Sequence, residues 1–346
     1  MKGGNKIWST LVDYFLILSA IIGVGFASGK EVYVFFFSFG GASVLGLIAF
    51  VLLYIYLFFI VEHVKRKLQL NSYNQFNRVI FGGLSKFSNV VLVVNFVIAS
   101  AGMLAGADYL FKTFFNVGFK IPSTILSIIT FVVLLGGIKK IKAVANFIIP
   151  IMITVIVVNS IANVTPANVN LKIIDANIGV AVYYALLFGV TNFVAAFPVL
   201  FQTSLKVKGR LAVVFSVALI ILLNILVLAS NATATDMPMF ELSQNLGNSF
   251  YILYFVALIF GLFSTLIICS FNTQTILNKN KKSWFISLII VLTNLIISNF
   301  GYNFIVKNLY IFSGMISGVY ILFLLLMIII KLRKNSKNNK NQHIKN

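Results

Sequence analysis

The chain has 346 residues, of which 60% are hydrophobic and only 10% are charged. Soluble domains carry about 25% charged residues. A soluble fold of this size could not hide so much apolar surface, so the composition excludes a soluble enzyme. The single cysteine, Cys269, excludes an intrachain disulfide framework. The net charge of +20 comes from 27 basic and 7 acidic residues.

Apolar runs without charges predict ten membrane-spanning helices, because about 20 apolar residues cross a bilayer as a helix. The runs place these spans at 10–37, 42–62, 87–111, 121–139, 142–162, 177–203, 210–230, 249–276, 283–300 and 307–331. The first two spans are separated at Gly40-Gly41, which we interpret as a tight turn. The expected fold class is therefore an all-α integral membrane protein.

The basic residues predict the orientation of the spans, because Lys and Arg are enriched in cytoplasmic connections. With a cytoplasmic N-terminus, every inside connection is basic and few basic residues lie outside. We therefore expect both the N- and C-termini to be cytoplasmic. This distribution accounts for the positive charge, so we expect no nucleic-acid partner. The Lys- and Asn-rich segment 332–346 is expected to be a disordered basic cytoplasmic tail.

The spans divide into two halves of five, residues 1–162 and 163–331. Because five is odd, the second half must enter the membrane from the opposite side, as an inverted repeat requires. The longest loop of each half falls at the same place, after its second span, and contains an amphipathic stretch. These stretches are 73–84 and 237–246. The sequence thus predicts two inverted five-helix repeats.

The first span of each half is predicted to be broken at mid-membrane. The span 10–37 would be about 42 Å long as a continuous helix, against a hydrocarbon core of about 30 Å. It contains Gly23, Gly25 and Gly29, and the span 177–203 contains Gly189 and then Pro198. Glycine-interrupted spans at corresponding positions indicate a transporter's binding site. The alternative is that these glycines allow close helix packing.

The segment 23–31, GVGFASGKE, resembles the start of the YkvI-type bacterial membrane proteins, a branch similar to the amino acid–polyamine–organocation transporters. The resemblance extends over the chain in length, span number and motif position. It implies the five-plus-five inverted-repeat fold of the sodium/amino-acid symporters and a location in the bacterial cell membrane. In that fold the first and sixth spans are broken and hold the substrate, and the third and eighth line the same cavity.

A broken helix offers amides that favour an anion and carbonyls that favour a cation. A zwitterion such as an amino acid satisfies both, so we expect a small zwitterionic substrate. The aromatic candidates are equally typical of ordinary core residues in a chain with 35 phenylalanines. The candidate substrate-binding residues are Gly23, Gly25, Phe26, Ser28, Ser100, Phe188, Gly189 and Asn192.

The resemblance also implies a sodium site, in which two adjacent hydroxyls of the eighth span share the ion with carbonyls of the first. The corresponding residues here are Ser264 and Thr265, with the carbonyls of Gly261, Ser19 and Ile22. Na⁺ is therefore a candidate coupling ion, and no other cofactor is expected. The alternative is that both hydroxyls bond to their own helix.

Ionisable residues within spans are candidates for gating, because burying a charge in a membrane is costly. Asp13, near the inner end of the first span, is a candidate inner gate that would pair with a cytoplasmic Lys or Arg. Lys30 and Glu31 follow the break, and Asp108 is a candidate partner of Lys30. The alternative is that all four lie solvated at the membrane interfaces.

The sequence predicts a secondary transporter that moves a small solute across the lipid bilayer by alternating access. The alternative function is a solute-sensing membrane receptor subunit of the same fold, similar to germinant receptors, without transport. The chain contains no HExxH motif, phosphate loop or mid-membrane carboxylate pair, so we do not expect an enzyme. The sequence does not identify a protein partner.

Overall fold

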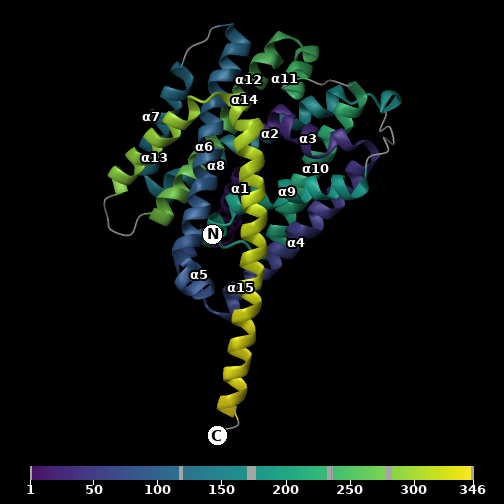
Figure 1. Cartoon of the computed structure of the whole chain (residues 1–346). Coiled ribbons are helices and arrows are strands. Elements are labelled where there is room, and N and C mark those ends of the chain that lie inside the picture. Colours follow the sequence, from purple (N-terminus) through teal and green to yellow (C-terminus); the bar gives the residue numbers. More distant parts are fainter. Residues whose placement is uncertain are drawn as a thin grey trace.

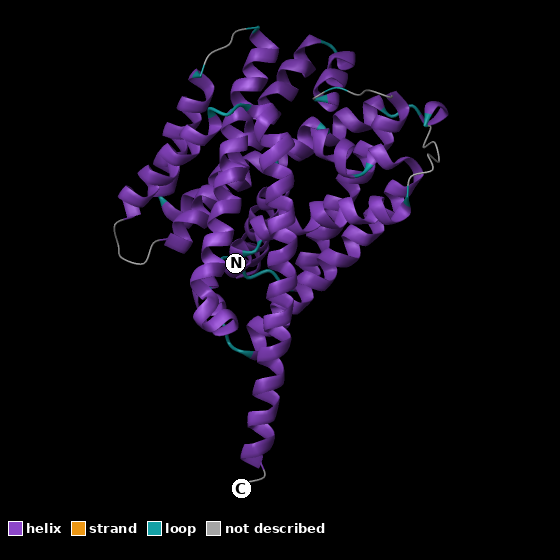
Figure 2. Ribbon diagram, viewed as in Figure 1, coloured by secondary structure: helices purple, strands orange, loops and turns teal. Residues whose placement is uncertain are grey.

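The structure is a computed structural model that describes residues 2–116, 120–169, 177–231, 235, 237–277 and 283–343. Every regular element in these ranges is a helix, as Figure 2 shows. Seven of the described helices are long and apolar enough to cross a membrane. Three shorter apolar helices, Ile7–Ile21, Ile121–Leu135 and Trp284–Ser298, lie at the first, fourth and ninth predicted spans. The chain is therefore a multi-helix membrane protein, and the count of ten spans stays a prediction.

The long helices form one bundle (Figure 1), and all of them except α1 and α15 begin and end within several residues of the predicted spans. They are α1 (Lys2–Ile21), α4 (Ser43–Lys67), α6 (Ser85–Phe115), α7 (Ile121–Leu135), α8 (Gly137–Asn163), α9 (Ile178–Ala196), α10 (Val207–Asn231), α12 (Asn248–Leu277), α13 (Ser283–Ser298) and α15 (Ile311–His343). Large apolar side chains such as Leu52, Phe59 and Leu322 are exposed on the outside of the bundle. Such a surface suits contact with lipid chains.

Short helical elements connect the long helices. The α-helical ones are α2 (Val24–Ser28), α3 (Lys30–Phe35), α5 (Tyr73–Phe81), α11 (Pro238–Leu242) and α14 (Tyr302–Phe304). The 3-10 elements are η1 (Phe37–Ala42), η2 (Gly82–Leu84), η3 (Pro166–Asn168), η4 (Pro198–Phe201) and η5 (Ser243–Leu246), and the π-helical one is η6 (Ile305–Tyr310). The two amphipathic loop stretches of the sequence correspond to α5 with η2 and to α11 with η5.

The chain leaves the α-helix where the glycines of the first span predict it. Helix α1 ends at Ile21 and α2 begins at Val24, with Gly23 in an extended conformation at φ −111° and ψ −167°. Helix α2 has only five residues and ends at Gly29, whose φ of 79° lies in the left-handed region that favours glycine. This turn begins α3 at Lys30. The predicted first span therefore consists of three helices, followed by η1.

The predicted break in the sixth span is wrong at Gly189. Helix α9 runs without interruption from Ile178 to Ala196 and leaves the α-helical form only at Phe197, beside Pro198. A methyl group at Gly189 would lie 2.9 Å from Leu53 Cδ2 of α4. The small residue therefore allows α4 and α9 to pack closely, which is the alternative that the sequence left open.

The segment 332–346 also differs from the prediction of a disordered tail. Helix α15 continues to His343 and extends beyond the rest of the bundle (Figure 1). Residues 344–346 lie outside the described residues. A helix already formed by an apolar span gains one hydrogen bond for each residue added, so it can extend into a polar sequence.

Contacts within the bundle occur in matching pairs in the two halves. Helix α1 contacts α8 as α9 contacts α15, and α6 contacts α7 as α12 contacts α13. Helix α6 contacts α15 as α12 contacts α8. The short α5 packs on α6 and α15, and the short α11 packs on α12 and α8. Each of these contacts therefore has a counterpart in the other half of the chain. Helices α6 and α12, which correspond to each other in the two halves, also pack together.

Candidate functional site

The interruption between α1 and α2 lies directly against α12. A methyl group at Gly23 would lie 2.6 Å from Thr265 Oγ1, and one at Gly261 would lie 3.4 Å from the amide nitrogen of Val24. Because neither glycine has a side chain, α12 can approach the interrupted backbone closely. The sequence thus brings the hydroxyl of Thr265 to the point where the first span leaves the helical form.

Side chains from two other helices and from Ser28 of α2 itself satisfy backbone carbonyls of α2. Asn224 Nδ2 of α10 donates to the carbonyl of Phe26 over 3.0 Å, and the Tyr254 hydroxyl of α12 donates to that of Ala27 over 2.5 Å. Ser28 Oγ donates to the carbonyl of Gly25 over 3.3 Å. Buried backbone groups in a membrane need such partners. Hydrogen bonds from side chains of α10 and α12 therefore hold the short helix α2 in place.

A small cavity of about 30 Å³ lies beside this interruption, between α1, α3, α6, α9, α12 and α15. This volume has room for no more than a few water molecules. The polar residues that line the cavity are Glu31, Asn95, Thr191, Asn192, Thr265 and Ser313. The only cysteine of the chain, Cys269, lines it too. The cavity is thus small, mostly enclosed by apolar residues and rich in hydrogen-bonding groups.

A second pocket, of about 220 Å³, adjoins the central cavity, because Glu31 and Met103 line both. Its other lining residues include Gly25 of α2, Lys30 of α3 and Tyr302 of α14. The two adjoining spaces together form a candidate solute site. Both charged residues of segment 23–31, Lys30 and Glu31, lie at this site.

The carboxylate of Glu31 lies directly over the backbone of Gly25. A methyl group at Gly25 would fall within 3.0 Å of both Cδ and Oε1 of Glu31. The turn at Gly29 produces this arrangement, because it starts α3 in a direction that returns Glu31 toward α2. The sequence predicts a gating role for Glu31, whereas the structure places its carboxylate at the candidate solute site.

The structure brings some of the predicted substrate-binding residues to this site and places others elsewhere. Gly23 and Asn192 line the central cavity, and Gly25 lines the second pocket. Phe26 and Phe188 lie with their ring centroids 5.3 Å apart, inside an aromatic cluster with Phe35, Phe36 and Phe50. These two phenylalanines therefore contribute to the core beside the site.

Three other predicted substrate-binding residues lie away from the two spaces and have contacts within the helix bundle. Gly189 faces α4, and the Ser28 hydroxyl is used locally, donating to Gly25 and accepting from the amide of Lys30. Ser100 is buried in α6 and is not among the residues that line the two described spaces. Their types fit a binding site, but the helix faces on which they lie do not point into it.

The residues of the predicted sodium site divide into two groups. Ser264 Oγ donates to the carbonyl of Gly261 over 3.0 Å, and Ser19 Oγ donates to that of Leu16 over 2.8 Å. Both hydroxyls thus bond within their own helix, although for Ser19 the predicted ligand is the backbone carbonyl, which these bonds do not test. The buried Thr265 Oγ1 has no hydrogen-bond partner among the described residues and faces the central cavity next to Gly23. Of the predicted hydroxyl ligands, Thr265 has the geometry to bind a ligand.

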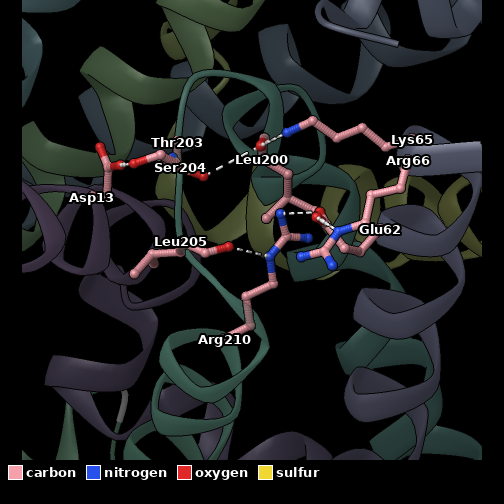
Figure 3. A network of polar contacts seen from close by, with 9 residues as sticks. All are labelled: Asp13, Glu62, Lys65, Arg66, Leu200, Thr203, Ser204, Leu205 and Arg210. Carbon is pink, nitrogen blue, oxygen red and sulfur yellow. Dashed lines mark hydrogen bonds and ion pairs between the residues drawn. The ribbon is translucent and has the colours of Figure 1, made fainter. Parts of the chain in front are cut away.

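Asp13 forms an ion pair with Lys142 of α8, with 2.7 Å between Oδ1 and Nζ. Its other oxygen, Oδ2, accepts from the amide and the hydroxyl of Ser204, over 2.7 and 2.9 Å (Figure 3). Ser204 belongs to the non-helical segment between η4 and α10. Asp13 therefore joins α1 to α8 and to the connection that follows α9.

A second set of contacts, which sequence reasoning missed, holds the same connection. Glu62 of α4 pairs with Arg210 of α10 over 2.6 Å and with Arg66 over 2.7 Å (Figure 3). Arg210 Nε donates to the carbonyl of Leu205, and Lys65 Nζ donates to that of Leu200. In the sequence these charges indicate only orientation. We call the end of the bundle that contains this network the basic end.

Asp108 has a partner different from the predicted one. Its Oδ1 accepts from the amide of Ser123 over 2.9 Å, in the first turn of α7. A carboxylate at a helix N-terminus satisfies a free amide and interacts favourably with the helix dipole. Lys30 instead lines the second pocket. Asp108 therefore caps α7 and connects it to α6.

Asn95 of α6 is a further polar residue at the cavity, and from the sequence it is only a weaker candidate for the site. Its Oδ1 accepts from the hydroxyls of Ser313 and Ser317 of α15, and its Nδ2 donates to the carbonyl of Val91. The signal available in the sequence was a polar residue inside an apolar span, which is more often used for helix–helix contact. Here it does both, since it joins α6 to α15 and lines the cavity.

Comparison with known proteins supports a transporter fold. No protein-family profile matches the chain. The uncharacterized membrane protein YkvI of Bacillus subtilis (strain 168) is 24% identical over 329 residues, which cover 89% of this chain and 92% of YkvI. The uncharacterized protein YyaD of the same strain is 21% identical over 324 residues, 90% of this chain and 94% of YyaD. The resemblance indicated by residues 23–31 is thus confirmed over most of the chain.

Two solved transporters share the fold. The Eremococcus coleocola manganese transporter superimposes with a TM-score of 0.60 at 15% identity, over 93% of this chain and 79% of that one. A nucleobase-cation-symport-1 family transporter, in a closed conformation with bromovinylhydantoin bound, gives a TM-score of 0.56 at 13% identity, over 91% and 78%. The chain is therefore a membrane protein with a transporter fold. Within that class, its sequence is similar to YkvI.

Proposed function

We propose that this protein is a secondary transporter that moves a small zwitterionic solute, such as an amino acid, by alternating access. The observation that carries the proposal is the interrupted helix between Ile21 and Val24 beside a small cavity that contains several hydrogen-bonding groups. Such an interruption is stable in a membrane only where its backbone is buried in protein or lines a solute site. The basic end would face the cytoplasm of a bacterial cell, with both termini on that side.

Alternating access would use the two halves of the chain as inverted repeats, residues 1–162 and 163–331. The matching contacts of the two halves support this arrangement. A cavity of about 30 Å³ is too small for an amino acid, so this conformation would be a closed one. To admit a solute, α1, α4, α9 and α10 would rock against α6, α7, α12 and α13. The ion pair between Asp13 of α1 and Lys142 of α8 would then break and form in each cycle, whereas Glu62 and Arg210 lie within the same moving group.

Sodium is the coupling ion that we propose. The buried and unpartnered Thr265 Oγ1 beside Gly23 supports this proposal, because hard cations bind several oxygen ligands. The carbonyls of Ser19, Ile22 and Gly261 would complete the site after a small rearrangement of their helices, while Ser264 Oγ stays bonded to the carbonyl of Gly261. Proton coupling through a basic residue in α8 has no support, since the apolar part of that helix carries no charge from 143 to 163.

The test is a recording of charge movement in proteoliposomes on a solid-supported membrane, with amino-acid mixtures applied with and without Na⁺. We expect a substrate-evoked current that requires Na⁺. Gly25→Leu should abolish it, because the new side chain would collide with Glu31. Gly83→Ala is the matched control, because no atom lies within 4 Å of its added methyl group.

Each other outcome has a definite meaning. A current that does not depend on Na⁺ would reject sodium coupling and retain transport. No current from folded protein would reject transport and favour the receptor subunit. A receptor should instead bind the solute without flux and require other subunits for its response.

A further inference from the structure

A groove of about 490 Å³ lies on the outside of the bundle, between α6, α7 and α12. The side chains described as lining it are all apolar, and they include Phe111, Phe115, Ile121, Ile125, Ile129 and Ile259. The three isoleucines of α7 recur every four residues, so they form a stripe about 12 Å long, and all three are exposed. This α7 groove is therefore a concave apolar surface that is open to the lipid chains of a membrane.

A space of about 400 Å³ with a different lining lies beside the same two helix ends. Lys112, near the end of α6, and Lys120, directly before α7, both line it, and we call it the lysine pocket. Lys112 directly follows Phe111 of the α7 groove, and Lys120 directly precedes Ile121. Because neighbouring Cα atoms are about 3.8 Å apart, the groove and the lysine pocket adjoin at both helix ends.

The lysine pocket carries an excess of positive charge. Lys120 Nζ donates to the uncharged Asn299 Oδ1 over 2.7 Å, and Lys112 has no ion pair in the part of the chain that the structure describes. The acidic residue described in the lining is Asp108, whose Oδ1 accepts from the amide of Ser123. The other oxygen of Asp108 is buried. Two ammonium groups and one carboxylate thus leave a net charge that attracts an anion.

The two lysines lie at the end of the bundle where basic residues are scarce. The end of α6 and the start of α7 are at the end away from α5 and from the protruding part of α15 (Figure 1). The proposed orientation places this end outside the cytoplasm, so the enrichment of basic residues in cytoplasmic connections does not account for the lysines. A lysine at a membrane interface lays its stem on apolar surface and extends its ammonium group toward the headgroups. The pattern of charge beside an apolar groove matches a phospholipid.

We propose that these two spaces together bind an anionic phospholipid, with one acyl chain in the α7 groove and the headgroup phosphate at Lys112 and Lys120. The charge of the lysine pocket favours an anionic headgroup over a neutral one, as in other basic pockets between membrane helices. The apolar lining of the groove favours a lipid chain over a free anion. The bound lipid would join α6, α7 and α12. This inference goes beyond the proposed transport and does not depend on it.

Photolabelling of the full-length protein would locate the lipid. Proteoliposomes of phosphatidylcholine and phosphatidylglycerol in equal amounts would carry a trace of one of these two lipids with a diazirine on its acyl chain. Mass spectrometry of peptides would then identify the labelled residues. We expect the phosphatidylglycerol probe to label Ile121, Ile125 and Ile129 about fivefold more than the phosphatidylcholine probe. Leu52 of α4, which is exposed to lipid elsewhere on the bundle, is the internal control and should react equally with both probes.

Variants separate the contribution of the headgroup from that of the chain. Lys112→Gln combined with Lys120→Gln should remove the preference between the probes, and because both lysines are exposed the fold should be retained. Lys139→Gln combined with Lys140→Gln removes the same charge from two other exposed lysines and should keep the preference. Ile125→Trp fills the α7 groove and should lower labelling of the groove by both probes.

Three results would overturn the proposal. The first is equal labelling of the α7 groove by the two probes, or no labelling there, and the second is a preference that survives in the variant without both lysines. The third is an unlabelled groove in a protein whose unfolding temperature rises with soluble glycerol phosphate, which would assign the lysine pocket to a free anion. If light scattering shows a dimer that Ile125→Trp dissociates and the groove stays unlabelled, the occupant is a second copy of the chain.

Discussion

Glu62 and Arg210 form an ion pair that joins α4 to α10, with 2.6 Å between Oε2 and Nη2. Arg210 is only 3% exposed, so its guanidinium depends on this partner. Glu62→Gln should therefore lower the free energy of unfolding by about 3 kcal/mol, because it leaves a buried charge without compensation. Thermal or denaturant unfolding in detergent measures the loss.

The matched control for this prediction is Arg66→Gln. The Arg66 side chain also pairs with Glu62, but it is 63% exposed. Exposed ion pairs contribute about 0–1 kcal/mol, so this variant should lose less than about 1 kcal/mol. Equal losses in the two variants would show that burial does not control the energetics of the network.

The ion pair between Asp13 and Lys142 is expected to stabilise the closed form of the basic end. Asp13→Asn should weaken the connection between α1 and α8, while Lys142, whose side chain is 28% exposed, gains contact with water. Cys269 is fully buried at the central cavity, so a shift of about 1 kcal/mol toward an open form would raise about fivefold the rate at which a small thiol reagent labels it. Lys139→Gln, on the exposed face of the same helix, is the control. An unchanged rate in Asp13→Asn would exclude a gating role.

Gly29 should tolerate substitution poorly, because its φ of 79° is unfavourable for residues with a side chain. An added methyl group would also lie 2.5 Å from Met239 Cγ of α11. We expect Gly29→Ala to cost about 2 kcal/mol of stability, of which the backbone conformation contributes about 1–2 kcal/mol. Gly83→Ala should be nearly neutral. Unfolding measurements on both variants check this, and a neutral Gly29→Ala would contradict it.

The two adjacent hydroxyl residues of α12 should differ in their effect on sodium. Thr265 Oγ1 has no hydrogen-bond partner in the part of the chain that the structure describes, whereas Ser264 Oγ donates to the carbonyl of Gly261. Thr265→Val keeps the shape of the side chain and removes the oxygen, so it should raise the Na⁺ concentration for half-maximal current at least tenfold. Ser264→Ala should change it by less than about threefold. Equal effects of the two variants would indicate that both hydroxyls bind the ion.

Much of the fold could be predicted from the sequence. The apolar run 87–111 predicts α6, and the run 249–276 predicts α12 within one residue at each end. The glycines at 23, 25 and 29 predict the interruption of the first span, because glycine disfavours a helix wherever it lies. The same reasoning failed at Gly189, where contact with Leu53 of α4 determines the role of the residue. A glycine pattern alone does not distinguish an interrupted helix from a closely packed one.

The candidate site was predicted less completely. Gly23, Asn192 and Thr265 were identified and lie at the central cavity. Ser100 was chosen for its residue type, but a helix presents each face to a different neighbour, and its face does not line the cavity. The network of Glu62 and Arg210 was missed, because residues in distant parts of the sequence meet only in the folded bundle.

By itself the sequence determined that this protein is a helical membrane protein, where its long helices lie, and where the first span leaves the helical form. Apolar length and glycine content act along the chain, so they can be read without knowing what lies beside it. Only the tertiary structure decided that Asp13 pairs with Lys142, that α9 is continuous at Gly189, and that the carboxylate of Glu31 covers Gly25. Those features depend on which helix faces contact each other, and these contacts are determined by packing between segments that are distant in the sequence.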